Sequence, residues 1–312
     1  MTDMPDILCC GEALIDMLPR QLDGQTVLRP TPGGAVYNTA VALGRLGVKS
    51  GLFTGLSTDL FGTQLAMFLA ESGVSSDLAH RSARPTTLAF VELRDGQARY
   101  SFYDEATAGR MLCPEDLPDL GTAPQALFAG GISLMSEPCA TAYEALVLRE
   151  APKRTIMLDP NIRPGFITDE PAYRARLGRM LAVADIVKVS DEDLAWIAGP
   201  EAGPQALLDR GPRLVFITRG GDGAEAVTAQ HSRAASPPKV SVTDTVGAGD
   251  TFNAGAMAAL LARGKLAKPA LAQLLDADLD AALSLACRAA AVTVTRAGAN
   301  PPWANELEPQ PA

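Results

Sequence analysis

Short apolar segments alternate along this chain with longer segments of helical periodicity. The apolar segments are Ile7–Cys10, Ala126–Ala129, Thr155–Leu158, Ile186–Val189 and Leu214–Thr218. Between them, segments such as Tyr37–Leu46, Gly62–Ser72 and Thr141–Glu150 carry apolar residues at helical spacing. Because continuously apolar strands are buried on both faces, this alternation predicts an α/β fold, in which helices cover both faces of a mostly parallel sheet. We expect the functional residues beyond the carboxyl ends of the strands.

Two segments interrupt this alternation with the pattern of β-hairpins. Leu88–Leu93 and Arg99–Tyr103 flank a polar turn that contains glycine, and Met17–Arg29 has the same character. One interpretation is that these excursions, near residues 16–30 and 86–104, form a small sheet that stands off the main one. The alternative is a pair of irregular surface hairpins.

Composition and charge exclude several classes of protein. The 312 residues include 27 Lys and Arg against 36 Asp and Glu, a formal net charge of −9, which disfavours binding to nucleic acid or to an anionic membrane. No apolar run approaches the ~20 residues that span a bilayer. Five cysteines without zinc-type spacing and an N-terminus unlike a signal peptide indicate a cytoplasmic protein with reduced thiols. No linker divides the chain, so we expect residues 1–312 to form a single domain with a structureless end from Ala299.

The most informative segment is Thr243–Gly264. In it Gly247, Ala248 and Gly249 precede a helical run of small residues. A glycine turn can direct several backbone amides to one point, and a helix N-terminus attracts anions. Asp250 follows the turn directly. It is either a simple helix cap or a carboxylate that accepts a proton beside a phosphate site.

A second segment, Pro32–Leu46, places Gly33 and Gly34 before a helix and Asn38 in its first turn. This pattern fits either a plain turn or a backbone that approaches a ligand closely. The signatures of P-loop ATPases, of Rossmann dinucleotide sites, of protein kinases and of zinc proteases are all missing from the sequence.

Together these two segments resemble the C-terminal and N-terminal signatures of the ribokinase-type (PfkB) sugar and nucleoside kinases. The resemblance extends from about Ile7 to Trp303. It implies a ribokinase-like sandwich with a β-sheet lid, and transfer of the γ-phosphoryl group of ATP to a sugar hydroxyl with the help of Mg²⁺. In that comparison Asp250 matches the catalytic base, and residues 247–249 match the anion hole.

The resemblance also implies the other site residues. The sugar-binding positions correspond to Asp16, Gly33, Gly34, Asn38, Tyr103, Asn161 and Arg163. The ATP-binding positions correspond to Lys188, Ser190, Thr218, Gly220, Gly221, Gly223, Gly249 and Cys287. A loop for a monovalent cation such as K⁺ corresponds to Asp244, Val246, Thr293, Arg296 and Gly298. The chain departs from the family at Ser190 and Asp193, where relatives carry an asparagine–x–x–glutamate pattern.

The segments Asp159–Phe166 and Tyr100–Tyr103 most resemble the fructokinase and 2-keto-3-deoxygluconate kinase branches of the family. In the keto-acid kinases an arginine shortly after the lid tyrosine pairs with the substrate carboxylate. Here Asp104 and Glu105 follow the tyrosine and would repel a carboxylate. We therefore expect a neutral sugar, with fructose first.

Other acceptors stay open as alternatives, namely 2-keto-3-deoxygluconate, ribose and nucleosides. A different class of function, a sugar-binding regulatory protein on the same fold, would be expected to lack the catalytic carboxylate or the glycine turn. Lid sheets in this family pair between subunits, which implies a homodimer through the lid.

Overall fold

The computed structural model describes residues 4–94 and 97–307. Its central sheet contains nine strands in the order β15-β14-β13-β12-β11-β10-β1-β4-β6. These are β1 (Ile7–Cys10), β4 (Ser50–Phe53), β6 (Val74–Ser75), β10 (Ala126–Gly130), β11 (Thr155–Asp159), β12 (Ile186–Ser190), β13 (Leu214–Thr218), β14 (Ala224–Val227) and β15 (Ser232–Ala235). Neighbours pair in parallel from β6 to β13, whereas β14 pairs antiparallel with both β13 and β15. The predicted mostly parallel sheet is confirmed.

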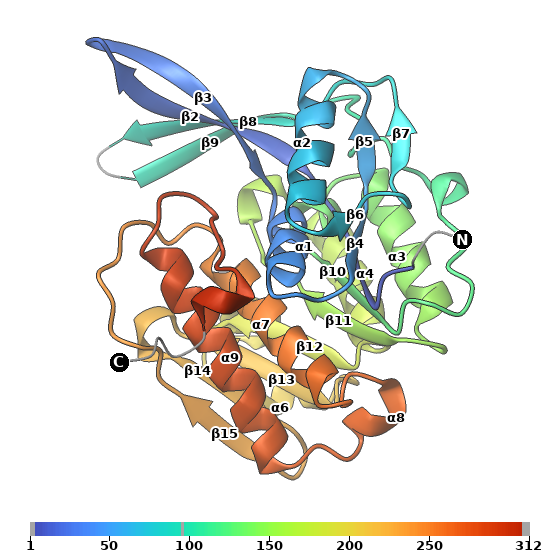
Figure 1. The fold of residues 1–312 in the computed structure, drawn as a ribbon. Coiled ribbons are helices and arrows are strands. Elements are labelled where there is room, and N and C mark those ends of the chain that lie inside the picture. The colour runs from blue at the N-terminus through green and yellow to red at the C-terminus, as the bar shows by residue number, and fades with distance from the viewer. Residues whose placement is uncertain (1–3, 95–96, 308–312) are drawn as a thin grey trace.

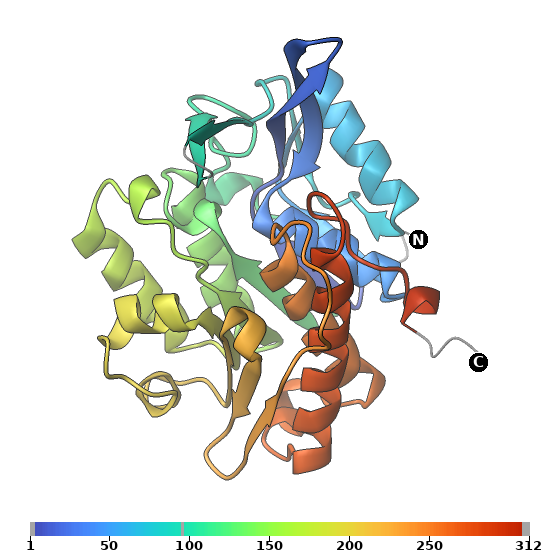
Figure 2. The ribbon, with the colours of Figure 1, turned by 90° about the vertical axis from the view of Figure 1, so that its left-hand side faces the viewer.

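Helices cover both faces of this sheet (Figures 1 and 2). One layer contains α1 (Ala35–Arg45), α2 (Leu60–Glu71), α7 (Ala248–Ala262), the short α8 (Lys268–Leu271) and α9 (Asp276–Val294). The other contains α3 (Cys139–Glu150), α4 (Glu170–Leu181), α5 (Asp191–Ala198) and α6 (Gln205–Leu208). Strand residues alternate between the two cores: Ile7 packs with the first layer and Leu8 with the second, because successive side chains point to opposite faces. Among the described helices, none has the length and apolar character to cross a membrane.

The two hairpin excursions form a separate sheet of four strands in the order β3-β2-β8-β9, which projects from one end of the body (Figure 1). The strands are β2 (Leu14–Leu22), β3 (Gln25–Gly33), β8 (Leu88–Arg94) and β9 (Gln97–Tyr103). The small standing sheet predicted from the sequence is therefore confirmed. A further pair, β5 (Gly55–Ser57) and β7 (His80–Ser82), forms its own two-stranded sheet.

The C-terminal segment is folded against the body as far as residue 307, so the prediction of a structureless end from Ala299 was wrong for residues 299–307. Pro301 and Pro302 are buried. Arg45 donates hydrogen bonds to Asn300 Oδ1 (2.7 Å) and to the Pro301 carbonyl (2.9 Å), and its guanidinium lies 5.3 Å from the ring centre of Trp303. Pro301 and Pro302 disfavour a helix at this point but permit an extended segment, which Arg45 at the end of α1 holds in place before a 3₁₀ turn at Ala304–Glu306.

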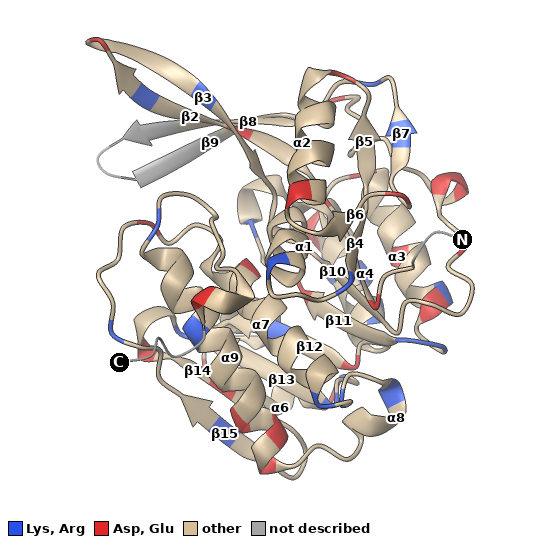
Figure 3. Cartoon of the chain, viewed as in Figure 1, with Lys and Arg blue, Asp and Glu red and all other residues tan. Residues whose placement is uncertain are grey.

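The charged residues are mixed in sign over the structure, and the cysteines are unpaired. Figure 3 shows Lys and Arg interspersed with Asp and Glu over many elements. All five cysteines are free thiols, as predicted, and four of them are buried.

Candidate active site

A cavity of about 350 Å³ lies at the carboxyl ends of the central strands and is closed on one side by residues of the lid sheet. Ten of the residues singled out in the sequence line it: Asp16, Gly34, Asn38, Asn161, Arg163, Lys188, Val246, Gly247, Gly249 and Asp250. They come from segments spread over most of the chain and meet at the edge of the sheet where binding was expected.

The N-terminus of α7 opens onto this cavity. The helix begins at Ala248 rather than at the predicted Asp250, and Gly247 precedes it with a left-handed conformation (φ 79°). A Cβ at Gly247 would lie 2.7 Å from the Cβ of Ala299, so this position needs glycine for space as well as for conformation. The first amides of a helix lack acceptors within the helix and carry its positive dipole end. This turn can therefore hold an anion.

Asp250 is the third residue of α7 and is not its cap. Its side chain is 8% exposed, and its Oδ2 accepts a hydrogen bond from Asn38 Nδ2 at 2.9 Å. Burial raises the pKa of Asp250 to about 7, against a smaller lowering by the Asn38 hydrogen bond. A carboxyl group that titrates near neutral pH is suited to accept a proton from a hydroxyl.

Lys188 lies beside the same helix turn. It projects from β12, is 5% exposed, and its Nζ donates to Asp159 Oδ2 at 3.0 Å. Asn253 Nδ2 donates to the same oxygen at 2.7 Å. A Cβ at Gly249 would lie 3.1 Å from Lys188 Nζ, which places the ammonium group against the first turn of α7. A buried cation at this point adds to the attraction of the turn for an anion.

Asp16 and the glycines of the second sequence segment form the side of the cavity nearest the lid. A Cβ at Gly33 would overlap the Asp16 carboxylate, and Gly34 adopts φ 108°. Burial raises the pKa of Asp16 to about 6. The carboxylate and the neighbouring Asn38 amide offer acceptors and a donor for a polar, hydroxyl-rich ligand.

The loop after β11 supplies the facing wall. Asn161 adopts φ 43°, and its backbone amide donates to Asp159 Oδ1 at 3.2 Å. Arg163 Nη1 donates to the Ile162 carbonyl at 3.0 Å, and its exposed side chain borders the cavity.

Tyr103 is 64% exposed and packs on Phe90 with ring centres 5.1 Å apart. The lid aromatic that lines the cavity is its neighbour, Phe102.

Ser190 and Asp193 form a capping box at the start of α5. Asp193 N donates to Ser190 Oγ (3.0 Å), and Ser190 N donates to Asp193 Oδ2 (3.3 Å). Asp193 Oδ1 accepts from Ile162 N at 2.9 Å, and burial raises the pKa of this carboxyl. The carboxylate therefore ties the loop after β11 to α5 in addition to any contact with a ligand.

The remaining residues assigned to ATP lie farther along the sheet. Thr218 stands beside Ser190 in the β12–β13 register. Gly220 and Gly221 form an exposed 3₁₀ turn, which ends at Gly223 with φ 104°. Cys287 is buried in α9, within the apolar cluster of that layer.

The residues assigned to a cation loop bring two segments together. Asp244 Oδ1 accepts from Val246 N (3.1 Å) and its Oδ2 accepts from Gly298 N (2.8 Å). Thr293 Oγ1 donates to Thr251 Oγ1 at 3.0 Å, and Arg296 pairs with Glu306. Within residues 4–94 and 97–307, no group of three or more His, Cys, Asp and Glu side chains is placed to hold a metal ion. A cation here would depend on backbone carbonyls.

Sequence reasoning missed Glu12, Asn253 and Phe102. Glu12 lies two residues after the end of β1 and lines the cavity. A charged residue at the end of an apolar strand was the available signal, because ligands bind beyond such ends. Asn253 lies one helical turn after Asp250, and no local pattern in this helix distinguishes it.

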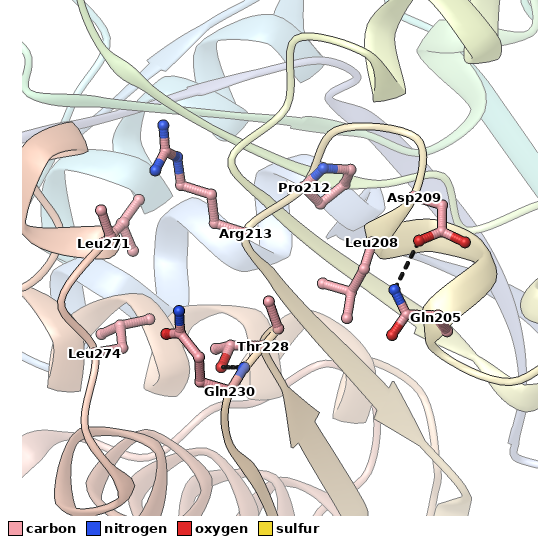
Figure 4. A pocket seen from close by; sticks show the side chains of 11 residues that line it. Gln205, Leu208, Asp209, Pro212, Arg213, Thr228, Gln230, Leu271 and Leu274 are labelled. Carbon is pink, nitrogen blue, oxygen red and sulfur yellow. Dashed lines mark hydrogen bonds between the residues drawn. The ribbon is translucent and has the colours of Figure 1, made fainter.

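A second cavity of about 340 Å³ lies away from these residues (Figure 4). Its walls come from α6, the segment before β13, the β14–β15 turn and the segment after α8. Gln205 Nε2 donates to Asp209 Oδ1 across one wall at 2.7 Å. None of the residues singled out in the sequence lines this cavity.

Comparisons with known proteins agree on one group. Residues 4–306 match the sequence model described as pfkB family carbohydrate kinase. A fructokinase of Rhizobium leguminosarum bv. trifolii is 51% identical over 273 residues, which cover 86% of this chain and 83% of that protein. The structure of a Xylella fastidiosa fructokinase with bound ATP superposes with a TM-score of 0.82 and 29% identity over 96% of this chain and 97% of that one. A Vibrio cholerae O395 fructokinase double mutant with fructose, ADP and potassium ion bound gives a TM-score of 0.82 and 27% identity over 95% and 94% of the two chains.

Proposed function

The chain belongs to the pfkB family of carbohydrate kinases, and from this premise we propose that it phosphorylates fructose with Asp250 as the catalytic base. It is an ATP-dependent sugar kinase. The observation that carries the proposal is the placement of the Asp250 carboxylate. It lines the same cavity as the N-terminal turn of α7 and as the polar side chains of Asp16 and Asn38 near the lid. The curated fructokinase at 51% identity and the solved fructokinases support fructose as the acceptor.

The proposed mechanism assigns each step to a side chain of the cavity. Asp16, Asn38 and Asn161 hold the sugar hydroxyls and turn one of them toward Asp250. Asp250 takes the proton of that hydroxyl while its oxygen forms a bond to the γ-phosphorus of ATP, and the bond to the β-γ bridging oxygen breaks to leave ADP.

The charge that develops on the transferred group is stabilised by fixed positive groups. These are the amides of residues 247–249, the Lys188 ammonium and, at the exposed edge, the Arg163 guanidinium. ATP supplies the phosphoryl group. Mg²⁺ would be held mainly by the phosphate oxygens and water and would neutralise phosphate charge. Asp193 does not line the cavity, is 6% exposed, and has two oxygens that already accept backbone hydrogen bonds, so it fits this role only in charge.

A neutral sugar is favoured for a different reason than the sequence indicated. Asp104 pairs with Arg110 at 2.9 Å and borders a smaller cavity, so its charge is compensated before it can repel a substrate. The carboxylates on the sugar side of the main cavity are Glu12 and Asp16. They disfavour a keto acid by like-charge repulsion.

A substrate panel tests the proposed function. In a coupled ATP-consumption assay, kcat/KM for fructose should exceed that for 2-keto-3-deoxygluconate, ribose and a nucleoside by at least about tenfold, a difference of ~1.4 kcal/mol in transition-state binding. The panel is run with and without K⁺, since a monovalent-cation loop is proposed at Asp244, Val246, Thr293, Arg296 and Gly298. A higher kcat/KM for the keto acid would contradict the assignment of fructose.

The pH dependence offers a test of the base. Because the pKa of Asp250 is raised to about 7 and the ionised form accepts the proton, kcat/KM should fall as the pH drops below this value. The Asn38 hydrogen bond lowers this pKa. Asn38→Ala should therefore move the acid limb of the profile to higher pH, whereas the surface variant Asn305→Ala leaves it in place. A shift of the Asn38→Ala profile to lower pH would contradict the assignment.

Three broader features are proposals on the same basis. We propose that residues 1–312 act as one domain, supported by apolar clusters that run along both faces of one sheet. We also propose a homodimer through the lid, supported by the exposed Leu22 and Leu28 of its first hairpin. A cytoplasmic location agrees with the five free thiols.

A further inference from the structure

Glu12 is a half-buried carboxylate of the cavity that takes no part in the phosphoryl transfer proposed above. It lies two residues after the end of β1, and its two oxygens accept hydrogen bonds from two different turns. Oε1 accepts from Ala35 N, the first residue of α1, at 2.9 Å. Oε2 accepts from Ser133 N, in the 3₁₀ turn after β10, at 3.3 Å. One side chain therefore joins the starts of two segments that border the active site.

Both turns are shaped around this side chain. Gly131 adopts φ 70°, and a Cβ there would overlap the Glu12 carboxylate. Gly34 adopts φ 108°, and a Cβ there would lie 2.9 Å from the Glu12 carbonyl oxygen and 3.1 Å from its Cγ. A non-glycine residue at either position would be strained in its backbone and would displace Glu12. The two glycines and the glutamate thus form one unit.

The start of α1 depends on Glu12 for its cap. Helices α2 and α4 are capped by their own Asp59 and Asp169. The cap residue of α1 is Gly34, which has no side chain. The acceptor for the first amide of α1 comes instead from Glu12, 23 residues earlier in the chain.

The hydrogen bond between Ala35 and Glu12 lies one helical turn before the two residues of α1 that hold Asp250. Asn38 donates to the Asp250 carboxylate at 2.9 Å, and Thr39 Oγ1 donates to the Asp250 carbonyl at 3.3 Å. We propose that Glu12 is a positioning residue for phosphoryl transfer, which holds the first turn of α1 against the turn after β10 and so keeps Asn38 in register with Asp250. The proposal rests on the kinase function proposed above.

Glu12→Gln tests this role because glutamine is isosteric but has one acceptor oxygen. Its amide group would face one of the two N–H donors, so one turn is released. Since small displacements at a reacting centre cost up to 10²-fold in rate, we expect kcat to fall by about 10- to 100-fold with the KM for ATP nearly unchanged. The matched control is Glu150→Gln, a buried glutamate that pairs with Arg154 at 2.7 Å away from the cavity. It should lower the melting temperature without lowering kcat.

A double-mutant cycle separates positioning from a general loss of stability. If Glu12 acts through Asn38, Glu12→Gln should cost less than about threefold in kcat in an Asn38→Ala background. Equal losses in both backgrounds, or an unchanged kcat in the single variant, would overturn the proposal. Glu12→Asp, whose shorter side chain does not reach both turns, repeats the cycle if Glu12→Gln does not fold. Failure of both variants to fold would assign Glu12 to the fold alone. An inactive wild type would instead refute the proposed function.

Discussion

Asp250→Asn is expected to lower kcat by about 10³- to 10⁴-fold, the upper range for loss of a general base. Asparagine fills the same volume and can still meet the Asn38 amide, but it cannot take a proton from the sugar hydroxyl. The amides of residues 247–249 and Lys188 remain in place, so the dissociation constant for ATP should be nearly unchanged. Steady-state kinetics and calorimetric titration of ATP measure the two effects separately.

A stability measurement checks the same variant without turnover. The pKa of Asp250 is raised from 3.8 to about 7 in the folded protein. Stability therefore falls as the pH rises between these two values, where the unfolded chain releases a proton that the folded protein keeps, and the full loss is present above pH 7. Asp250→Asn removes this cost, and its melting temperature should rise relative to wild type at pH 8 by more than at pH 4. The surface variant Asp209→Asn serves as control for both measurements. Retained turnover in Asp250→Asn would remove this residue as the base.

The sequence predicts the architecture well because the relevant signals are local. Ile7–Cys10 and Leu214–Thr218 are continuously apolar, so their place in a covered parallel sheet follows from the pattern itself. The hairpin around Asp23 and Gly24 follows from turn chemistry in the same way. The fold at residues 299–307 was missed because its order depends on Arg45, which lies far away in the chain.

The residues of the site differ in the same way: some are indicated by a local pattern, and others depend on contacts between distant segments. Glycine turns before helices can be recognised from the residues: Gly34 precedes α1 directly, as predicted, and Gly247 precedes α7, which begins two residues earlier than predicted. The pairing of Asn38 with Asp250 spans 212 positions, and no local pattern indicates it. The role of Glu12 depends on two glycines from different segments that come together in the folded chain. Residues whose function consists of holding another residue are therefore the ones that the sequence leaves unmarked.

Lys188→Met should lower kcat by about 10²- to 10³-fold, comparable to the loss of one preorganised donor to a developing anion. The methionine chain has similar length but no charge beside the first turn of α7. The substitution also leaves the buried Asp159 without its cation, which typically costs about 3–5 kcal/mol of stability. Chemical denaturation and steady-state kinetics would therefore both change, and the single variant does not tell the two causes apart.

The double variant Lys188→Met/Asp159→Asn separates them. Asparagine removes the uncompensated charge, and its side chain can still bond with Asn253, so most of the lost stability should return. The missing ammonium does not return, and kcat should stay low. Lys268→Met, which removes a partner of Asp185 elsewhere on the sheet, controls for the loss of a lysine that pairs with a buried aspartate. Recovery of kcat together with stability in the double variant would show that Lys188 serves the fold and not the phosphoryl group.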